Sequence, residues 1–131
     1  MTNVTFYKDK ENRKLRPELF SQTAENLAKS ISSADSSGRL NKRTQLRKFY
    51  DEVLRLNLQT KANPGDWDDI LPYVNMLIAK GAYAEGRKLV TGEFVRFMQD
   101  SIQQIEKPED LDVFANLFEA FMGFYKKYGK D

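Results

Sequence analysis

Basic side chains gather in two short stretches of this 131-residue chain, and their types and spacing suit the binding of phosphate groups. Arg43 and Arg47 stand four positions apart and therefore share one face of a helix. Lys80, Tyr83 and Arg87 have a similar helical spacing further along the chain. Arginine makes two-pronged contacts with phosphate oxygens, and lysine adds a point charge. The candidate phosphate-binding residues are Lys42, Arg43, Arg47, Lys48, Lys80, Arg87 and Lys88.

The same charges also suit an ordinary solvated helix face, which is the usual place for charged side chains. Arg47 can pair with Asp51, and Lys48 can pair with Glu52, at helical spacing. The net charge is only +2, so the composition excludes a uniformly basic nucleic-acid-binding protein. Any binding of a polyanion must depend on where the basic residues lie, and spacing alone leaves both interpretations open.

The chain has no cysteine and no histidine, which excludes many kinds of active site. Cysteine nucleophiles, disulfides, histidine bases and zinc sites built on either residue are ruled out. The acidic residues Asp66, Asp68 and Asp69 could hold Mg²⁺ in a carboxylate-metal enzyme. They also favour the start of a helix through capping and the helix dipole, and we prefer that interpretation. Since a Walker-type phosphate loop is also missing, we expect no catalytic residue, no metal and no cofactor.

The elements that must position the basic residues are predicted to be helices. Apolar residues recur at helical spacing, and no segment shows the sustained alternation of a strand with hairpin turns. The polar run over residues 32–38 (SSADSSG) is predicted to be a linker, and Asn63-Pro64-Gly65 a turn. Pro72 indicates either a bend in one helix or a short turn before a new one. The predicted helix starts are Pro17, Asn41, Asp66, Thr91 and Pro108, and the last helix is expected to stop at Gly129.

These elements predict an all-α protein, a compact bundle of five or six helices in a single domain. Residues 1–16 are polar and charged, and we expect a flexible or partner-ordered arm there, followed by one helical-bundle domain over residues 17–131. The aromatic stripe of the last helix, namely Phe114, Phe118, Phe121 and Tyr125, is expected to lie in the core. Without a long apolar run or a signal-peptide pattern, we expect a cytoplasmic protein.

Three segments resemble the Csm small-subunit family of type III-A CRISPR effector complexes. Residues 41–52 (NKRTQLRKFYDE) are similar to the first signature helix of that family, with its Leu-Arg pair. Residues 77–88 (LIAKGAYAEGRK) resemble the second signature, a Tyr followed by a Gly-Arg step, here Tyr83 and Gly86-Arg87. Residues 118–131 (FEAFMGFYKKYGKD) resemble the aromatic and lysine-rich last helix. The resemblance covers nearly everything after Gly38.

The resemblance implies a non-catalytic subunit of an antiviral ribonucleoprotein. Such subunits touch the guide–target RNA pairing through its backbone, so specificity comes from base pairing and not from the protein. The implied partners are the crRNA, the target RNA, the large polymerase-type subunit, the backbone subunits and further copies of the chain itself. Arg47 matches the Leu-Arg pair and Arg87 the Gly-Arg step. We add the other five candidates on electrostatic grounds.

Two further alternatives stay open beside the carboxylate-metal enzyme. One is a purely structural protein–protein interaction subunit, in which the basic and aromatic helices contact other proteins. The other is a helical DNA-binding regulator, although no clear recognition helix is visible in the sequence. The linker over residues 32–38 could also act as a hinge that lets the isolated chain form a homodimer.

Overall fold

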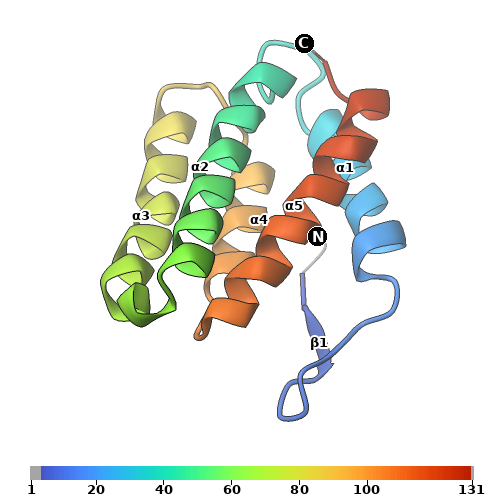
Figure 1. Ribbon diagram of the computed structural model, residues 1–131. Helices are drawn as coiled ribbons and strands as arrows, with labels where there is room; N and C mark the ends of the chain where they lie inside the picture. The colour runs from blue at the N-terminus through green and yellow to red at the C-terminus, as the bar shows by residue number, and fades with distance from the viewer. Residues whose placement is uncertain (1–3, 131) are drawn as a thin grey trace.

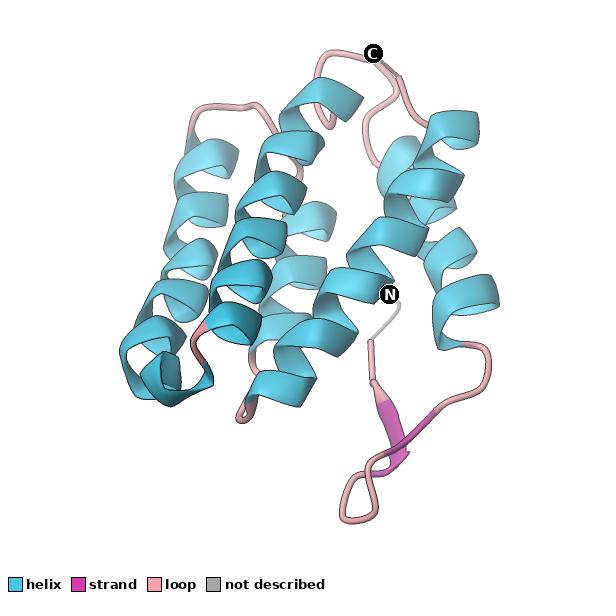
Figure 2. Cartoon of the chain, viewed as in Figure 1, coloured by secondary structure: helices cyan, strands magenta, loops and turns pink. Residues whose placement is uncertain are grey.

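Five α-helices carry most of the chain in the computed structural model, which describes residues 4–130 (Figures 1 and 2). They form one compact, mostly helical domain, as the sequence predicts, with a two-stranded antiparallel hairpin added before the first helix. Among the described residues, no helix combines the length and the apolar character needed to cross a membrane. The helices are α1 (Ala24–Ser33), α2 (Arg43–Ala62), α3 (Trp67–Gly86), α4 (Gly92–Ile102) and α5 (Pro108–Tyr128), and the strands are β1 (Tyr7–Asp9) and β2 (Lys14–Leu15).

The core is built around the aromatic side chains of α4 and α5. Phe97 is buried and has ring centroids of Phe114, Phe118 and Phe121 between 5.1 and 6.0 Å from its own. Most of these pairs meet edge to face, the arrangement that the ring quadrupole favours. The expectation that the stripe of α5 lies in the core is confirmed, since its members, Tyr125 included, are at most 1% exposed.

Helix α2 lies between α3 and α5 in the bundle, with α1 on the far side of α5 (Figure 1). A 3-10 turn, η2 (Pro64–Asp66), joins α2 to α3, so the two helices run in opposite directions. Pro72 lies inside α3, which continues past it as one helix, so the alternative of a separate helix from Pro72 is wrong. The amino-terminal half of α2 therefore lies beside the carboxyl-terminal half of α3.

Two predicted helix starts differ from the structure. The first helix is preceded by a π-helical turn, η1 (Leu19–Thr23), and α1 itself begins only at Ala24. Asn41 does not cap α2, because Lys42 holds that position. Asn41 has a left-handed backbone (φ 56°), and its side-chain amide donates to the Ile31 carbonyl at 3.0 Å and to the Thr91 hydroxyl at 2.8 Å. Its role is therefore to join the end of α1 to the start of α4.

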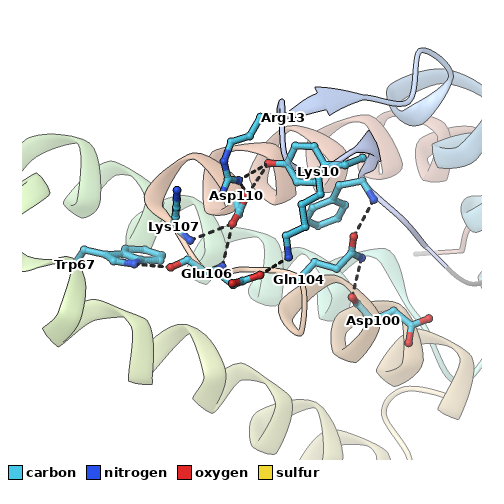
Figure 3. Close-up of polar contacts among 10 residues, drawn as sticks. Lys10, Arg13, Trp67, Asp100, Gln104, Glu106, Lys107 and Asp110 are labelled. Atoms are coloured by element: carbon cyan, nitrogen blue, oxygen red, sulfur yellow. Dashed lines mark hydrogen bonds and ion pairs between the residues drawn. The ribbon is translucent and has the colours of Figure 1, made fainter.

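The segment before the helices lies against the core over the part that the structure describes. Val4 and Phe6 are buried. Just after α4, the side-chain amide of Gln104 accepts a 2.8 Å hydrogen bond from the Phe6 N–H (Figure 3) and donates one of 2.7 Å to the Val4 carbonyl. Residues 1–3 of the predicted arm lie outside the described residues. That residues 1–16 are flexible, or become ordered on a partner, stays a prediction.

Candidate nucleic-acid interface

The two basic stretches of the sequence meet in a groove between α2 and α3. The groove has a volume of about 340 Å³ and lies where the start of α2 passes the end of α3. We call it the α2–α3 groove. Its lining residues are Gln45, Lys48, Phe49 and Glu52 from α2, Leu77, Lys80, Tyr83, Ala84 and Arg87 from and just after α3, and Leu89. Of the seven candidates, Lys48, Lys80 and Arg87 are thus brought together.

The floor of this groove is apolar and its rim is cationic. Phe49, Leu77 and Ala84 are at most 7% exposed. The side chains of Lys48, Lys80 and Arg87 are exposed at the surface above them. Grooves that combine low-dielectric walls with charge of one sign concentrate the electrostatic potential, and here the sign attracts anions.

Glu52 also lines the groove, but its charge is partly offset by a neighbour on the same helix. Its carboxylate accepts hydrogen bonds of 3.1 to 3.3 Å from the guanidinium of Arg55. These bonds, together with the positive charge of Lys80, hold the pKa of Glu52 below its usual value. The sequence suggested a pair between Lys48 and Glu52, whereas the structure pairs Glu52 with Arg55, leaving Lys48 on the rim.

Arg43 and Arg47 lie on the other flank of α2, in a second groove of about 260 Å³ formed with α5. We call it the α2–α5 groove. It is completed by Thr44, Met122 and Lys126. Arg47 and Asp51 form the predicted pair at 3.9 Å, but both side chains are more than 60% exposed, so water and salt screen the attraction. The structure therefore does not bring Arg47 into the same groove as Arg87.

Lys42 precedes the first turn of α2, where the chain end returns. Lys42 and Lys130 form an isolated parallel bridge, and the Lys130 carbonyl accepts a 2.6 Å hydrogen bond from the Arg43 N–H. No acidic residue stands in the first turn of α2. Basic residues at a helix amino terminus oppose the helix dipole, so this arrangement adds to the positive potential of that end at some cost in stability.

Lys88 lies just beyond α3 in a tight carboxyl-terminal turn. Its N–H donates to the Glu85 carbonyl at 2.9 Å, and the Leu89 N–H donates to the Ala84 carbonyl at 3.0 Å. These two bonds are those of a Schellman motif, whose left-handed position usually belongs to glycine. Lys88 holds it here with φ 59°, and its side chain is exposed.

The acidic cluster lies at the opposite end of the α2–α3 pair. Asp68 and Asp69 stand in the first turn of α3, where negative charge suits the helix dipole. Asp66 and Asp69 line a groove of about 350 Å³ together with Arg55 and Tyr73. Within residues 4–130, no group of three or more Asp, Glu, His or Cys is placed to hold a metal ion. The surface between α2 and α3 thus changes from acidic to basic along its length.

Sequence reasoning missed three polar residues that complete the grooves, one of which is Thr44. Lys126 joins Arg43 and Arg47 from α5, and Gln45 joins Lys48 from α2. Local spacing could not reveal Lys126, because its contact with the basic stretch depends on which helix packs beside α2. The signal that pointed toward it was the lysine-rich end of the last helix, which carried part of the family resemblance.

One comparison with known proteins supports that resemblance. The family model described as Csm2 Type III-A matches residues 14–131, which includes α1 to α5 and both grooves. The resemblance noted in the sequence is confirmed by this match. No curated protein and no solved structure matches the chain.

Proposed function

We propose a role for this chain that follows from its family. The chain belongs to the Csm2 Type III-A family and is thus a small subunit of a type III-A CRISPR complex. In that complex it supports guide–target RNA pairing through sequence-independent backbone contacts. In this role it needs no catalytic centre and acts in the cytoplasm in antiviral defence. Its partners are the crRNA, the target RNA, the large polymerase-type subunit, the backbone subunits and further copies of itself. Base pairing supplies the specificity, and the protein supplies shape and charge.

The observation that carries this proposal is the convergence of Lys48, Lys80 and Arg87 on one groove. Lys48 is far from the other two in sequence, and only the packing of α2 against α3 brings them together. The three exposed cations offer phosphate groups more than one positive charge at a single site, and binding there releases counterions from the nucleic acid.

The basic surface continues across α2 on the side of α5. Arg43, Arg47 and Lys126 form the α2–α5 groove, and Lys42 lies beside the first turn of the same helix. RNA phosphates that cross the amino-terminal half of α2 would meet basic residues on both flanks. The carboxylates of Asp66 and Asp69 at the other end of α3 oppose a path along the whole length of the helix pair.

The experiment that tests the proposal is co-purification of the tagged chain with its complex after a high-salt wash. We expect Arg47→Glu combined with Arg87→Glu to leave folding intact, because both side chains are exposed. The double variant should recover less RNA with the complex and show a weaker dependence of RNA binding on salt. The salt slope should fall by about 0.7 to 0.9 for each phosphate that the protein no longer neutralises. A matched control is Lys8→Glu with Arg96→Glu, which makes the same charge change at exposed positions outside both grooves.

A double variant that assembles normally and carries the full amount of RNA would contradict the site assignment. Loss of assembly in samples from which RNA has been removed would instead favour the purely structural subunit. One observation favours that alternative. Tyr73 and Met76 on the outer face of α3 are 58% and 45% exposed, and large apolar side chains at a surface suit contact with another protein. Selection of a palindromic DNA site would favour the helical DNA-binding regulator.

A further inference from the structure

Tyr83 gives the α2–α3 groove a second kind of binding chemistry. We propose that the groove holds one unpaired RNA nucleotide, with the base stacked on the ring of Tyr83 and the phosphate on Lys48, Lys80 and Arg87. This inference rests on the proposed function and extends it from backbone charge to the face of a base. It adds Tyr83 to the candidate RNA-contacting residues, as the group that stacks.

The exposure of Tyr83 is the first step of the argument. Its side chain is 66% exposed, the highest value among the large apolar side chains that the structure describes. The chain buries most of its other aromatic rings, including those of the helix stripe in α5. A flat ring on the surface at the edge of a cationic groove offers a stacking platform, and every base has a face that can use it.

Arg87 makes a cation–π contact with the ring of Tyr83. Its guanidinium carbon lies 5.8 Å from the ring centroid, within the range of a cation–π contact. The contact restricts both side chains before any ligand arrives, so less conformational entropy is lost on binding. It also places a positive charge beside the base, where the phosphate of the same nucleotide can reach it.

The remainder of the groove matches the two halves of a nucleotide. Its floor is made of Phe49, Leu77 and Ala84, which suits the apolar face of a base. Its rim carries Lys48 and Lys80, which suit a phosphate, and the one carboxylate in its lining, that of Glu52, is bonded to Arg55. A base inside a duplex has both faces covered by its neighbours, so only an unpaired nucleotide can use the ring and the charges together.

Tyr73 on the same helix provides an internal comparison. It is 58% exposed, nearly as much as Tyr83, but it lies in the groove that contains Asp66 and Asp69. A nucleotide stacked there would bring its phosphate close to two carboxylates and one guanidinium, that of Arg55, which is already bonded to Glu52. The two tyrosines therefore differ in the charge around them and not in their exposure, which makes Tyr73→Ala a matched control.

The test measures RNA binding by the full chain through fluorescence anisotropy, at about 50 mM salt, where phosphate contacts are strong. The probes are a labelled uridine homopolymer and the same strand annealed to its complement. We expect Tyr83→Ala to weaken binding of the single strand roughly 5- to 100-fold, the loss of one stacked base, and to leave duplex binding nearly unchanged. Tyr83→Phe should retain single-strand binding, and Tyr73→Ala should behave as the unsubstituted chain.

Equal weakening of single-strand and duplex binding by Tyr83→Ala, or no effect on either, would overturn the inference. Lys48→Gln separates this failure from failure of the proposed function. If Lys48→Gln weakens binding of both RNAs while Tyr83→Ala changes neither, the groove binds phosphates only and the proposed function stands. If neither variant alters binding, or the unsubstituted chain binds neither RNA, both the inference and this assignment of the RNA site fail.

Discussion

The hydroxyl of Tyr7 donates a 2.5 Å hydrogen bond to the carboxylate of Asp110, which stands 103 positions further along the chain. Arg13 donates to the same oxygen, and the N–H groups of Glu106 and Lys107 donate to the other oxygen at 3.0 Å each (Figure 3). The side chain of Asp110 is completely buried. One carboxylate therefore ties the amino-terminal hairpin to the loop before α5 and to the first turn of that helix.

We expect Asp110→Ala to lower the free energy of unfolding by about 3 kcal/mol, because it leaves Arg13, the Tyr7 hydroxyl and two N–H groups without their acceptor. Tyr7→Phe removes the bond donated to Asp110 and the 3.2 Å bond accepted from Arg13, and should cost about 1 to 2 kcal/mol. Urea unfolding measures both. The control Glu119→Ala, at an exposed position of α5, should change stability by less than about 0.5 kcal/mol. An Asp110→Ala protein as stable as the control would contradict this role of the carboxylate.

Stability should fall in acid, and Asp110 and Asp35 are two of the carboxylates whose lowered pKa values cause this. Burial alone raises the pKa of Asp110, but the hydrogen bonds from Tyr7 and the backbone, with the charge of Arg13, bring it below its usual value. In the loop after α1, the N–H of Leu40 and the hydroxyl of Ser37 lower the pKa of Asp35 from 3.8 to about 2. Both groups are more acidic in the folded than in the unfolded chain. Their contribution to the free energy of unfolding is therefore fully present above the pKa of the unfolded chain. It is lost as the pH falls through the pKa of the folded chain.

For Asp35 that window runs from pH 3.8 down to about 2. Urea unfolding at several pH values in this window measures the decline. Asp35→Asn should flatten the decline, because the amide does not titrate. An unchanged pH dependence in Asp35→Asn would show that the loop contributes nothing to the acid sensitivity.

Helix boundaries set by local chemistry were predictable from the sequence. Pro108 begins α5, because the fixed φ of proline suits a first helical turn whatever packs around it. Thr91 precedes α4 as predicted, but its side chain makes no capping hydrogen bond, and its hydroxyl accepts from Asn41 instead. Asn41 was wrongly predicted to cap α2, because its hydrogen bonds go to α1 and to the start of α4 instead. The short hairpin gave no strand signal, because its strands of three and two residues are too short for a sustained alternation.

The candidate site was predictable in its residue types but not in its arrangement. Spacing placed Arg43 and Arg47 on one helix face, which the α2–α5 groove confirms. Spacing could not show that Arg47 and Lys48, which are neighbours in sequence, line different grooves. That division depends on α2 packing between α3 and α5, and the order of helices in a bundle is set by tertiary contacts.

Gly129 ends α5 as predicted, but for a different physical reason. Its φ is −86°, so it does not use the left-handed conformation typical of glycine at a helix end. A Cβ at this position would lie 2.1 Å from Cε2 of Tyr125, a buried ring whose hydroxyl donates to the Asn41 carbonyl at 2.5 Å. Burial also raises the pKa of that hydroxyl to about 12, so it stays protonated.

We therefore expect Gly129→Ala to lower the free energy of unfolding by about 1 to 3 kcal/mol through overpacking. Gly123→Ala is the matched control within the same helix, because nothing lies within 4 Å of its added Cβ. That change should raise stability by about 0.5 to 1 kcal/mol through helix propensity. Thermal unfolding of both variants measures the difference, and the same sign of effect in both would contradict the close-approach argument.

Substitutions at Lys88 should change the stability of the fold and the binding of RNA independently of each other. Lys88 has a left-handed backbone conformation. For any residue with a Cβ this conformation is unfavourable by about 1 to 2 kcal/mol, whereas glycine adopts it freely. Since glycine also gains freedom in the unfolded chain, we expect Lys88→Gly to raise the free energy of unfolding by only about 0.5 kcal/mol. Lys88→Ala, the control, removes the charge but keeps the strained backbone, so it should give no such gain.

The same pair of variants tests Lys88 as a phosphate contact. If its charge meets a phosphate, both variants should weaken RNA binding and reduce the salt slope by about 0.7 to 0.9, whatever their stability. Urea unfolding and RNA titration of each variant then report on independent properties. A glycine variant that is more stable and binds RNA with an unchanged salt slope would remove Lys88 from the candidate interface, because its charge would then contribute nothing to binding.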